Sequence, residues 1–321
     1  MAALPDYPGE PLIDLRELTA EDLKPLLEEE VLEWRASLDW DFRPSADLVR
    51  RFVQVHALNG LALAIAGRIA GYSYFVSEEG KGLVGDFYVT RAARTAAHEN
   101  RLLEAVLDSM WRTPGMRRIE AQLMMIGSPL DRAAPYLRWF QAYPRKFLEA
   151  SLAGVHSLPA RDPEGAAFSS WTESWQEEAA RLIAHAYRGH VDSLINDQYR
   201  SAAGARRFLT NIVQYPGCGS FFAPASFIAW DRAERKLCGI SLASLVAEDA
   251  GHITQICVAP SHHGRKIGYE LLRRSLVSMA AHGCRSVSLT VTSANEPALR
   301  LYEGAGFRTR RDFAAYVWEI A

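Results

Sequence analysis

Residues 258–268 read Val258-Ala259-Pro260-Ser261-His262-His263-Gly264-Arg265-Lys266-Ile267-Gly268, and they pass from a strand pattern through a polar turn into a helix pattern. The first backbone N–H groups of a helix have no partners within it, and they lie at the positive end of the helix dipole. Gly264 and Gly268 allow close approach of a ligand, while Arg265 and Lys266, the latter in helical conformation, add positive charge. This junction predicts a binding site for a phosphate or diphosphate.

The elements around this junction predict a mixed sheet with helices on both faces. Apolar runs indicate strands at 221–230, 237–246, 252–258, 286–291 and 307–320, and a 3.6-residue period indicates a helix at 264–282. A short helix is expected at 297–303, before two glycines. The sequence Ser174-Trp175-Gln176-Glu177 predicts a capping box at the start of the first helix in this half.

The first half of the chain repeats this order of elements. It has a helix start at 19–22, strand patterns at 62–69, 69–76, 83–89 and 118–125, and a helix pattern at 100–111. When Val89 is aligned with Val258 without a gap, Leu102 and Leu103 fall on Leu271 and Leu272. We therefore predict an internal duplication. The expected fold class is α/β (α+β), with two similar domains in tandem, each a mixed, mostly antiparallel sheet flanked by helices.

The segment 158–165, which is rich in proline and charge, is the expected linker between domains 1–157 and 166–321. With 49% apolar and 23% charged residues the chain has the composition of a globular protein, and its net charge of −2 predicts no general attraction to nucleic acid. The four cysteines have no metal-ligand spacing, so we predict no metal site and inert thiols, including Cys238 and Cys257. Without a signal sequence or a long apolar run, the protein is expected to be cytoplasmic and not bound to a membrane.

A second motif follows the strand pattern at 286–291 and reads Asn295-Glu296-Pro297-Ala298-Leu299-Arg300-Leu301-Tyr302-Glu303-Gly304-Ala305-Gly306-Phe307. Together the two motifs resemble the signatures of the GNAT superfamily of N-acetyltransferases, Gln/Arg-x-x-Gly-x-Gly/Ala and Asn-x-x-Ala-x-x-Leu-Tyr-x-x-x-Gly-Phe. The second signature is complete. The first departs from the pattern at His263, which replaces Gln or Arg, and at Lys266, which replaces a glycine. The resemblance covers about residues 250–310.

The resemblance implies an N-acetyltransferase that uses acetyl-CoA as co-substrate and acts on an amine of a small molecule or peptide. It implies that the pantetheine arm pairs with the strand that leads to the loop, and that the diphosphate binds the loop. The cofactor-binding residues it predicts are Ile256, Cys257, Val258, His263, Gly264, Arg265, Lys266, Ile267, Gly268, Tyr269 and Asn295.

Direct attack by an amine requires a base for the ammonium and allows an acid for the departing thiolate. By resemblance, Tyr302 occupies the position of the acid, with simple packing as the alternative. His252 stands at the position of the base, and imidazole suits proton transfer near its ordinary pKa of about 6.5. Glu248, Asp249 and water are the alternatives. The polar segment 190–199, with Asp192 and Asp197, corresponds to the part of the family fold that lines the acceptor cleft, although a solvated loop explains it equally well.

The first half lacks both signatures. The gapless register places Glu99 where Gly268 stands, and an acidic side chain at a helix N-terminus repels an anion. We therefore expect no coenzyme A in the first half. This arrangement resembles tandem members of the superfamily such as mycothiol synthase, in which one domain keeps the active site and the other supports it.

Two other functions are compatible with parts of the sequence. A catalytically silent module that senses acyl-CoA would explain the changes at His263 and Lys266. A regulatory protein that binds a nucleotide phosphate would leave the motif 295–307 unexplained. The sequence specifies neither the acceptor, which includes the choice between N- and O-linked, nor the acyl chain length or the oligomeric state.

Overall fold

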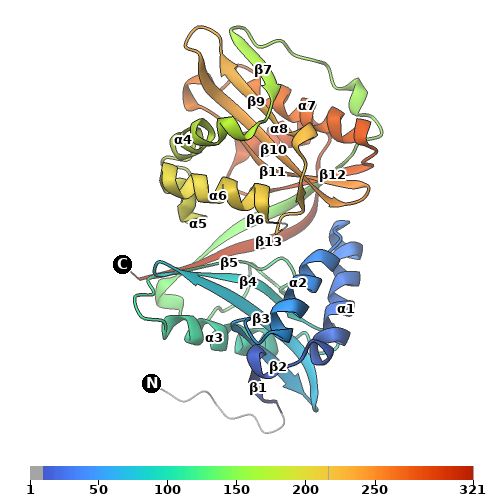
Figure 1. Ribbon diagram of the computed structural model, residues 1–321, viewed down its shortest axis with the longest axis vertical. Helices are drawn as coiled ribbons and strands as arrows, with labels where there is room; N and C mark the ends of the chain where they lie inside the picture. The colour runs from blue at the N-terminus through green and yellow to red at the C-terminus, as the bar shows by residue number, and fades with distance from the viewer. Residues whose placement is uncertain (1–9, 216, 321) are drawn as a thin grey trace. The chain divides into compact units, whose positions relative to one another are not determined.

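The computed structural model describes residues 10–215 and 217–320, which form two compact units (Figure 1). The first unit comprises residues 10–36, 41–144 and 312–320, and the second comprises residues 37–40, 145–215 and 217–311. Each unit is an open mixed sheet flanked by helices, so the predicted fold class is confirmed. No helix among the described residues is long and apolar enough to cross a membrane.

The sheet of the first unit is antiparallel except for one parallel pair. In spatial order its strands are β1 (Leu12–Asp14), β2 (Gly60–Ile65), β3 (Arg68–Glu78), β4 (Lys81–Val89), β5 (Arg118–Gln122) and the part of β13 (Arg308–Glu319) from residue 312 onward. Only β4 and β5 run parallel. The helices of this unit are α1 (Ala20–Leu38), α2 (Arg43–Gln54) and α3 (Ala96–Trp111).

Helices α1 and α3 contact opposite faces of this sheet. Because successive side chains of a strand point to opposite faces, Phe87 and Val89 share one face and Tyr88 lies on the other. Phe87 and Val89 belong to the same buried cluster as the α3 leucines, whereas the Tyr88 hydroxyl donates to Glu29 and Glu33 of α1 at 3.0 Å each.

The sheet of the second unit has the same plan. In spatial order its strands are β7 (Ala166–Ser170), β9 (Phe227–Asp231), β10 (Lys236–Ala247), β11 (Ala250–Val258), β12 (Ser286–Thr292) and the part of β6 (Phe140–Ser151) from residue 145 onward, and β8 (Ser220–Phe221) also pairs with β10. Again one pair, β11 and β12, is parallel. The helices are α4 (Gln176–Ala186), α5 (Asp192–Ile195), α6 (Ala202–Gln214), α7 (Ile267–His282) and α8 (Glu296–Gly304).

A matching pair of glycine and methionine supports the predicted duplication. On β4, a Cβ added to Gly82 would lie 2.2 Å from the Cε atom of Met110 on α3. On β11, a Cβ added to Gly251 would lie 2.4 Å from the Sδ atom of Met279 on α7. The gapless register predicted from the sequence aligns both glycines and both methionines. In each unit the glycine lets the helix pack closely on the parallel strand pair.

The last strand of each half of the sequence completes the sheet of the other unit. From Arg145 to Ser151, β6 pairs with β12 in the second unit, and from Ala315 to Glu319, β13 pairs with β5 in the first. The segment 158–165, expected to be a linker, lies within the second unit, where the Tyr269 hydroxyl donates to the Pro159 carbonyl at 3.0 Å.

The two predicted helix starts have different outcomes. At α1, the Thr19 amide donates to the Asp22 carboxylate at 2.8 Å and the Asp22 amide to the Thr19 hydroxyl at 3.4 Å, which is a reciprocal cap. The capping box predicted at Ser174 is wrong. A 3-10 turn over Glu173–Trp175 precedes α4, and the Ser174 hydroxyl contacts Thr172 instead.

Candidate active site

A cavity of about 530 Å³ lies in the second unit where β11 ends. Its walls come from β11, the following loop, the first turn of α7, the helix α8 and the segment after α4. The structure brings together there nearly all of the predicted site residues, namely Ile256, Cys257, Val258, His263, Gly264, Lys266, Ile267, Gly268, Tyr269, Asn295 and Tyr302. Of the predicted residues, Arg265 and His252 are not in the wall.

The strands β11 and β12 separate as they approach the cavity. They pair from Ala250 to Ile253 on β11 and from Ser286 to Leu289 on β12. Beyond that point β11 continues to pair with β10 up to Val258, and β12 continues to pair with β6 up to Thr292. The last residues of β11 therefore have one backbone edge without a strand partner in the described chain, and this edge can pair with an extended ligand.

The loop after β11 presents a run of backbone amides to the cavity. The amide of His263 donates to the Pro260 carbonyl and that of Glu270 to the Lys266 carbonyl. Between them, the amides from Gly264 to Tyr269 have no acceptor among residues 10–215 and 217–320. Free amides at the N-terminus of a sixteen-residue helix form an anion site.

Two basic residues of the loop differ from expectation. Lys266 is not helical, because it adopts φ 65° and caps α7 in the left-handed region, which explains why the family pattern has glycine there. Arg265 donates to the Glu164 carbonyl at 2.8 Å and lies 3.8 Å from the Asp231 carboxylate. Its charge is thereby held outside the cavity wall, whereas Lys266 remains part of it.

The second motif places α8 against this loop. The Asn295 side chain accepts the Ala298 amide at 3.3 Å and caps the helix. A Cβ added to Gly268 would lie 3.7 Å from Cδ2 of Leu301, so the two helices meet at this glycine. Gly306 has φ 96°, and this turn brings Phe307 to a ring distance of 5.9 Å from Tyr302. The motif therefore fixes the ring of Tyr302 in the cavity wall.

Tyr302 is 6% exposed, and its hydroxyl has no hydrogen-bond partner among the described residues. Burial raises the pKa of Tyr302 above its usual value, and the negative charge of Asp192 raises it further. The hydroxyl therefore keeps its proton at neutral pH and can donate it.

His252 is enclosed away from the cavity. Its ring is 5% exposed, with Trp40 at 5.2 Å and Phe147 at 6.2 Å, and its Nδ1 atom lies 2.8 Å from the Ser288 hydroxyl on β12. Burial lowers the pKa of His252 to about 3, so the ring is neutral at pH 7. In this position it links the two parallel strands.

Tyr187 and His190 line the cavity, and they contact polar groups that the sequence motifs do not identify. The side-chain Nε2 of Gln255 donates to the Tyr187 hydroxyl at 3.1 Å, and the ring of Tyr187 stacks on that of Tyr199 at 4.4 Å between ring centres. Asp192 accepts a hydrogen bond from Thr292 at the end of β12 and lies 3.6 Å from Nδ1 of His190, which is in the cavity wall. The alternation of side chains along β11 could have predicted that Gln255 lies on the same face of the sheet as Cys257.

The thiols near the site are protonated. Burial raises the pKa of Cys257 to about 12 and that of Cys238 to about 11. Among residues 10–215 and 217–320, no group of three or more His, Cys, Asp or Glu side chains is arranged to hold a metal ion.

Residues 169–307 match the sequence model of the acetyltransferase (GNAT) family. This segment, which is less than half of the chain, is therefore similar to a GNAT acetyltransferase domain. A mycothiol acetyltransferase from Actinosynnema mirum is 30% identical to this chain over 162 residues, which is 50% of this chain and 50% of that relative. The match therefore spans half of the relative's length.

Solved structures share the fold along nearly the whole chain. A GCN5-related N-acetyltransferase from Sphaerobacter thermophilus superposes with a TM-score of 0.68 at 18% identity, covering 99% of this chain and 97% of that one. A tandem GNAT protein from the clavulanic acid biosynthesis pathway gives a TM-score of 0.65 at 16% identity, covering 97% and 98%. At these identities the likeness shows the fold alone, and both units follow it.

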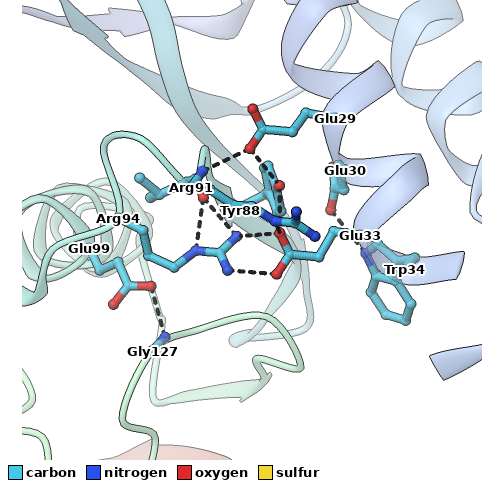
Figure 2. Close-up of polar contacts among 10 residues, drawn as sticks. Glu29, Glu30, Glu33, Trp34, Tyr88, Arg91, Arg94, Glu99 and Gly127 are labelled. Atoms are coloured by element: carbon cyan, nitrogen blue, oxygen red, sulfur yellow. Dashed lines mark hydrogen bonds and ion pairs between the residues drawn. The ribbon is translucent and has the colours of Figure 1, made fainter. Parts of the chain in front are cut away.

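In the first unit, the loop that corresponds to 258–268 forms ion pairs with Glu33 of α1 (Figure 2). Arg94 donates to both Glu33 carboxylate oxygens, at 2.6 and 3.1 Å, and to the Val89 carbonyl. The Arg91 amide donates to Glu29 at 2.7 Å. Although burial opposes it, the hydrogen bonds from Arg94 and Arg91 lower the pKa of Glu33 to about 2.

Glu99, at the position of Gly268, lies in the first turn of α3 and is 2% exposed. Its carboxylate accepts the Gly127 amide and the Arg132 guanidinium, both at 2.8 Å (Figure 2 draws the first contact). The positive end of α3 is therefore matched by a carboxylate of its own chain.

Proposed function

We propose that this protein transfers an acetyl group from acetyl-CoA to an amine, with a single active site in the second unit. The observation that carries the proposal is the run of free amides from Gly264 to Tyr269, at a helix start, in the wall of the cavity that also contains Tyr302. The match of residues 169–307 to the GNAT family supports it. The mycothiol acetyltransferase, which this chain matches over half of its length, supports the class of reaction. Its acceptor is not assigned to this protein.

The residues of the cavity fit coenzyme A in two ways. The loop amides suit the diphosphate, with Lys266 supplying a nearby charge and His263 and Gly268 bordering the same wall. The free edge of β11 at Ile256, Cys257 and Val258 suits the amide groups of pantetheine. When bound, acetyl-CoA supplies an acetyl group activated as a thioester.

Two side chains of the second unit are assigned to proton transfer. The amine nitrogen attacks the acetyl carbon with its lone pair, the bond from that carbon to sulfur breaks, and the sulfur takes the proton of the Tyr302 hydroxyl, which solvent later restores. The amine must lose one proton to become an amide. We assign this proton to the carboxylate of Asp192, which lies 3.6 Å from Nδ1 of His190 in the cavity wall. We do not assign it to His252, because the ring of His252 is enclosed and links β11 to β12.

The activity is tested by thiol release from acetyl-CoA with a panel of primary amines, together with binding of coenzyme A by calorimetry. If the protein is an acetyltransferase, it will bind coenzyme A and release thiol in proportion to the amount of amine that is acetylated. Binding without turnover across the panel would favour the acyl-CoA sensor. Absence of binding would contradict the proposed site itself.

A further inference from the structure

A second cavity of the GNAT domain adjoins the first and is lined by arginines. It has a volume of about 440 Å³ and lies between the end of α4 and the start of α6. Its basic side chains are Arg181, His185, Arg188 and Arg200, and its lining among the described residues contains no Asp or Glu. In a chain with a net charge of −2, this concentration of positive charge is a local feature.

The geometry places this cavity on the acceptor side of the site. Tyr187 is in the wall of both cavities, whereas none of the loop residues 262–268 lines the arginine cavity. Ser193 also lines it and directly follows Asp192 in α5. The first turn of α6, at Ser201 and Ala202, adds the positive end of a thirteen-residue helix.

The guanidinium groups differ in how they are held. Arg200 donates to the Ser193 carbonyl at 2.8 Å, which fixes its side chain beside the cavity. Arg181 lies 3.4 Å from Glu178 in an exposed pair, and its side chain is 62% exposed. An exposed pair of this kind contributes little, so Arg181 can turn to an incoming anion at small cost.

We infer that the acceptor is an amine that also carries an anionic group, a phosphate or carboxylate, and that this group binds in the arginine cavity. The inference rests on the proposed function and names its substrate class. The ammonium end then lies beside Asp192 and the anionic end beside Arg181 and Arg188, with Tyr187 between the two cavities. Planar guanidinium groups are suited to bind either kind of anion.

The experiment compares glucosamine with glucosamine 6-phosphate, which offer the same amine without and with an anionic group. We expect kcat/KM to be at least about tenfold higher for the phosphate, a difference of about 1.4 kcal/mol. In the double variant Arg181→Gln/Arg188→Gln this preference should fall to within about twofold, through a higher KM for the phosphate, while the rate with glucosamine is unchanged. Both arginines are exposed, so the variant is expected to fold. Arg206→Gln, which removes an exposed arginine of α6 paired with Glu177, is the matched control.

The anion could also be the 3′-phosphate of coenzyme A. If it is, the double variant will weaken binding of coenzyme A but not of dephospho-coenzyme A, and the inference is overturned. Equal kcat/KM for the two amines would overturn it as well.

A binding measurement tests the inference even if neither amine is acetylated. Protein saturated with coenzyme A, whose loop is then filled, is titrated with inorganic phosphate in a thermal-unfolding assay. A rise in Tm that is lost in the double variant supports the inference, and no rise contradicts it. Failure to bind coenzyme A would instead contradict the proposed function, so the two failures are distinguishable.

Discussion

Gly268 lies where the proposed diphosphate site meets α8, and the space around it decides what a side chain would do. An added Cβ would have ordinary contacts, at 3.5 Å from Cγ2 of Val258 and 3.7 Å from Cδ2 of Leu301. A small side chain is therefore tolerated by the fold. A carboxylate at this position would face the bound diphosphate and repel it.

We expect Gly268→Glu to fold with a near-normal Tm and to lose at least about tenfold in affinity for acetyl-CoA, or about 1.4 kcal/mol. Titration calorimetry measures the loss. Gly268→Ala is the matched control, because it adds the Cβ without charge and should stay within a few-fold of the original affinity. If the glutamate variant bound as tightly as the alanine variant, the diphosphate would have to lie elsewhere.

Tyr302 has a buried hydroxyl that lacks a partner among the described residues, and its raised pKa means that the hydroxyl is protonated at neutral pH and available to the departing thiolate. Tyr302→Phe keeps the ring and removes the proton. We expect kcat to fall by about 10² to 10⁴ while the KM for acetyl-CoA changes little, because the acid acts only in the transition state. Steady-state kinetics with a good acceptor tests this. If Tyr302→Phe kept near-normal turnover and Tyr302→Ala bound the cofactor more weakly, the ring would only pack against the cofactor.

Asp192 is predicted to take the proton of the acceptor. Asp192→Asn should lower kcat/KM for the acceptor by about 10² or more, since the amide cannot accept a proton. The loss should be smaller for amines with a more acidic ammonium, because more of such an amine is already deprotonated. Asp197→Asn, which changes another carboxylate of the same polar segment, is the control. A loss of equal size for all amines would point to a structural role for Asp192.

At the scale of the element, Glu33 ties α1 to the loop between β4 and α3. Its carboxylate is 6% exposed and pairs with Arg94 and Arg91. Glu33→Gln leaves the half-buried Arg94 without its ion pair, so we expect the free energy of unfolding at pH 7 to fall by about 3 kcal/mol in urea titrations. Glu21→Gln, at an exposed position of the same helix, should change it little.

The same contact predicts a pH dependence. The pKa of Glu33 is about 2 in the folded protein, below the value of about 4.3 of an unfolded glutamate. Its contribution is therefore complete above about pH 4.3 and is lost as the pH falls towards 2. The difference in stability between the original protein and Glu33→Gln should shrink over that range. A difference that stays constant from pH 7 to pH 2 would contradict the assignment.

The sequence was most informative where one element carries a complete pattern. The helix at α7 follows a 3.6-residue period and α8 is delimited by Asn295 and Gly306, so both were predicted to within a few residues. In contrast, β6 was missed because Pro144, Arg145 and Lys146 interrupt its alternation, and pairing with β12 stabilises it. The positions of Arg265 and His252 depend on Asp231, Glu164 and Trp40, which are distant in sequence.

Within the whole molecule, the two units differ in what occupies the start of the matching helix. In the second, the amides from Gly264 to Tyr269 have no acceptor among the described residues and border the cavity, whereas in the first the carboxylate of Glu99 and the Arg94–Glu33 pair lie at the matching helix start. We therefore expect calorimetry to give one coenzyme A per full-length chain, and Gly268→Glu to weaken all of that binding. Two sites per chain, or a second site that the variant leaves intact, would refute this prediction.

The exchange of final strands has a consequence for synthesis on the ribosome. Residues 312–320 belong to the first unit, so the sheet that begins near residue 12 lacks its last strand until these residues have been synthesised. The exposed edge of β5 must stay unpaired during that time, and contacts between residues so far apart in sequence form slowly. The described residues of the second unit, 37–40, 145–215 and 217–311, all precede residue 312, so its sheet can form first. We therefore expect the sheet of the second unit to be complete before that of the first, which reverses the order in which the two halves of the chain begin.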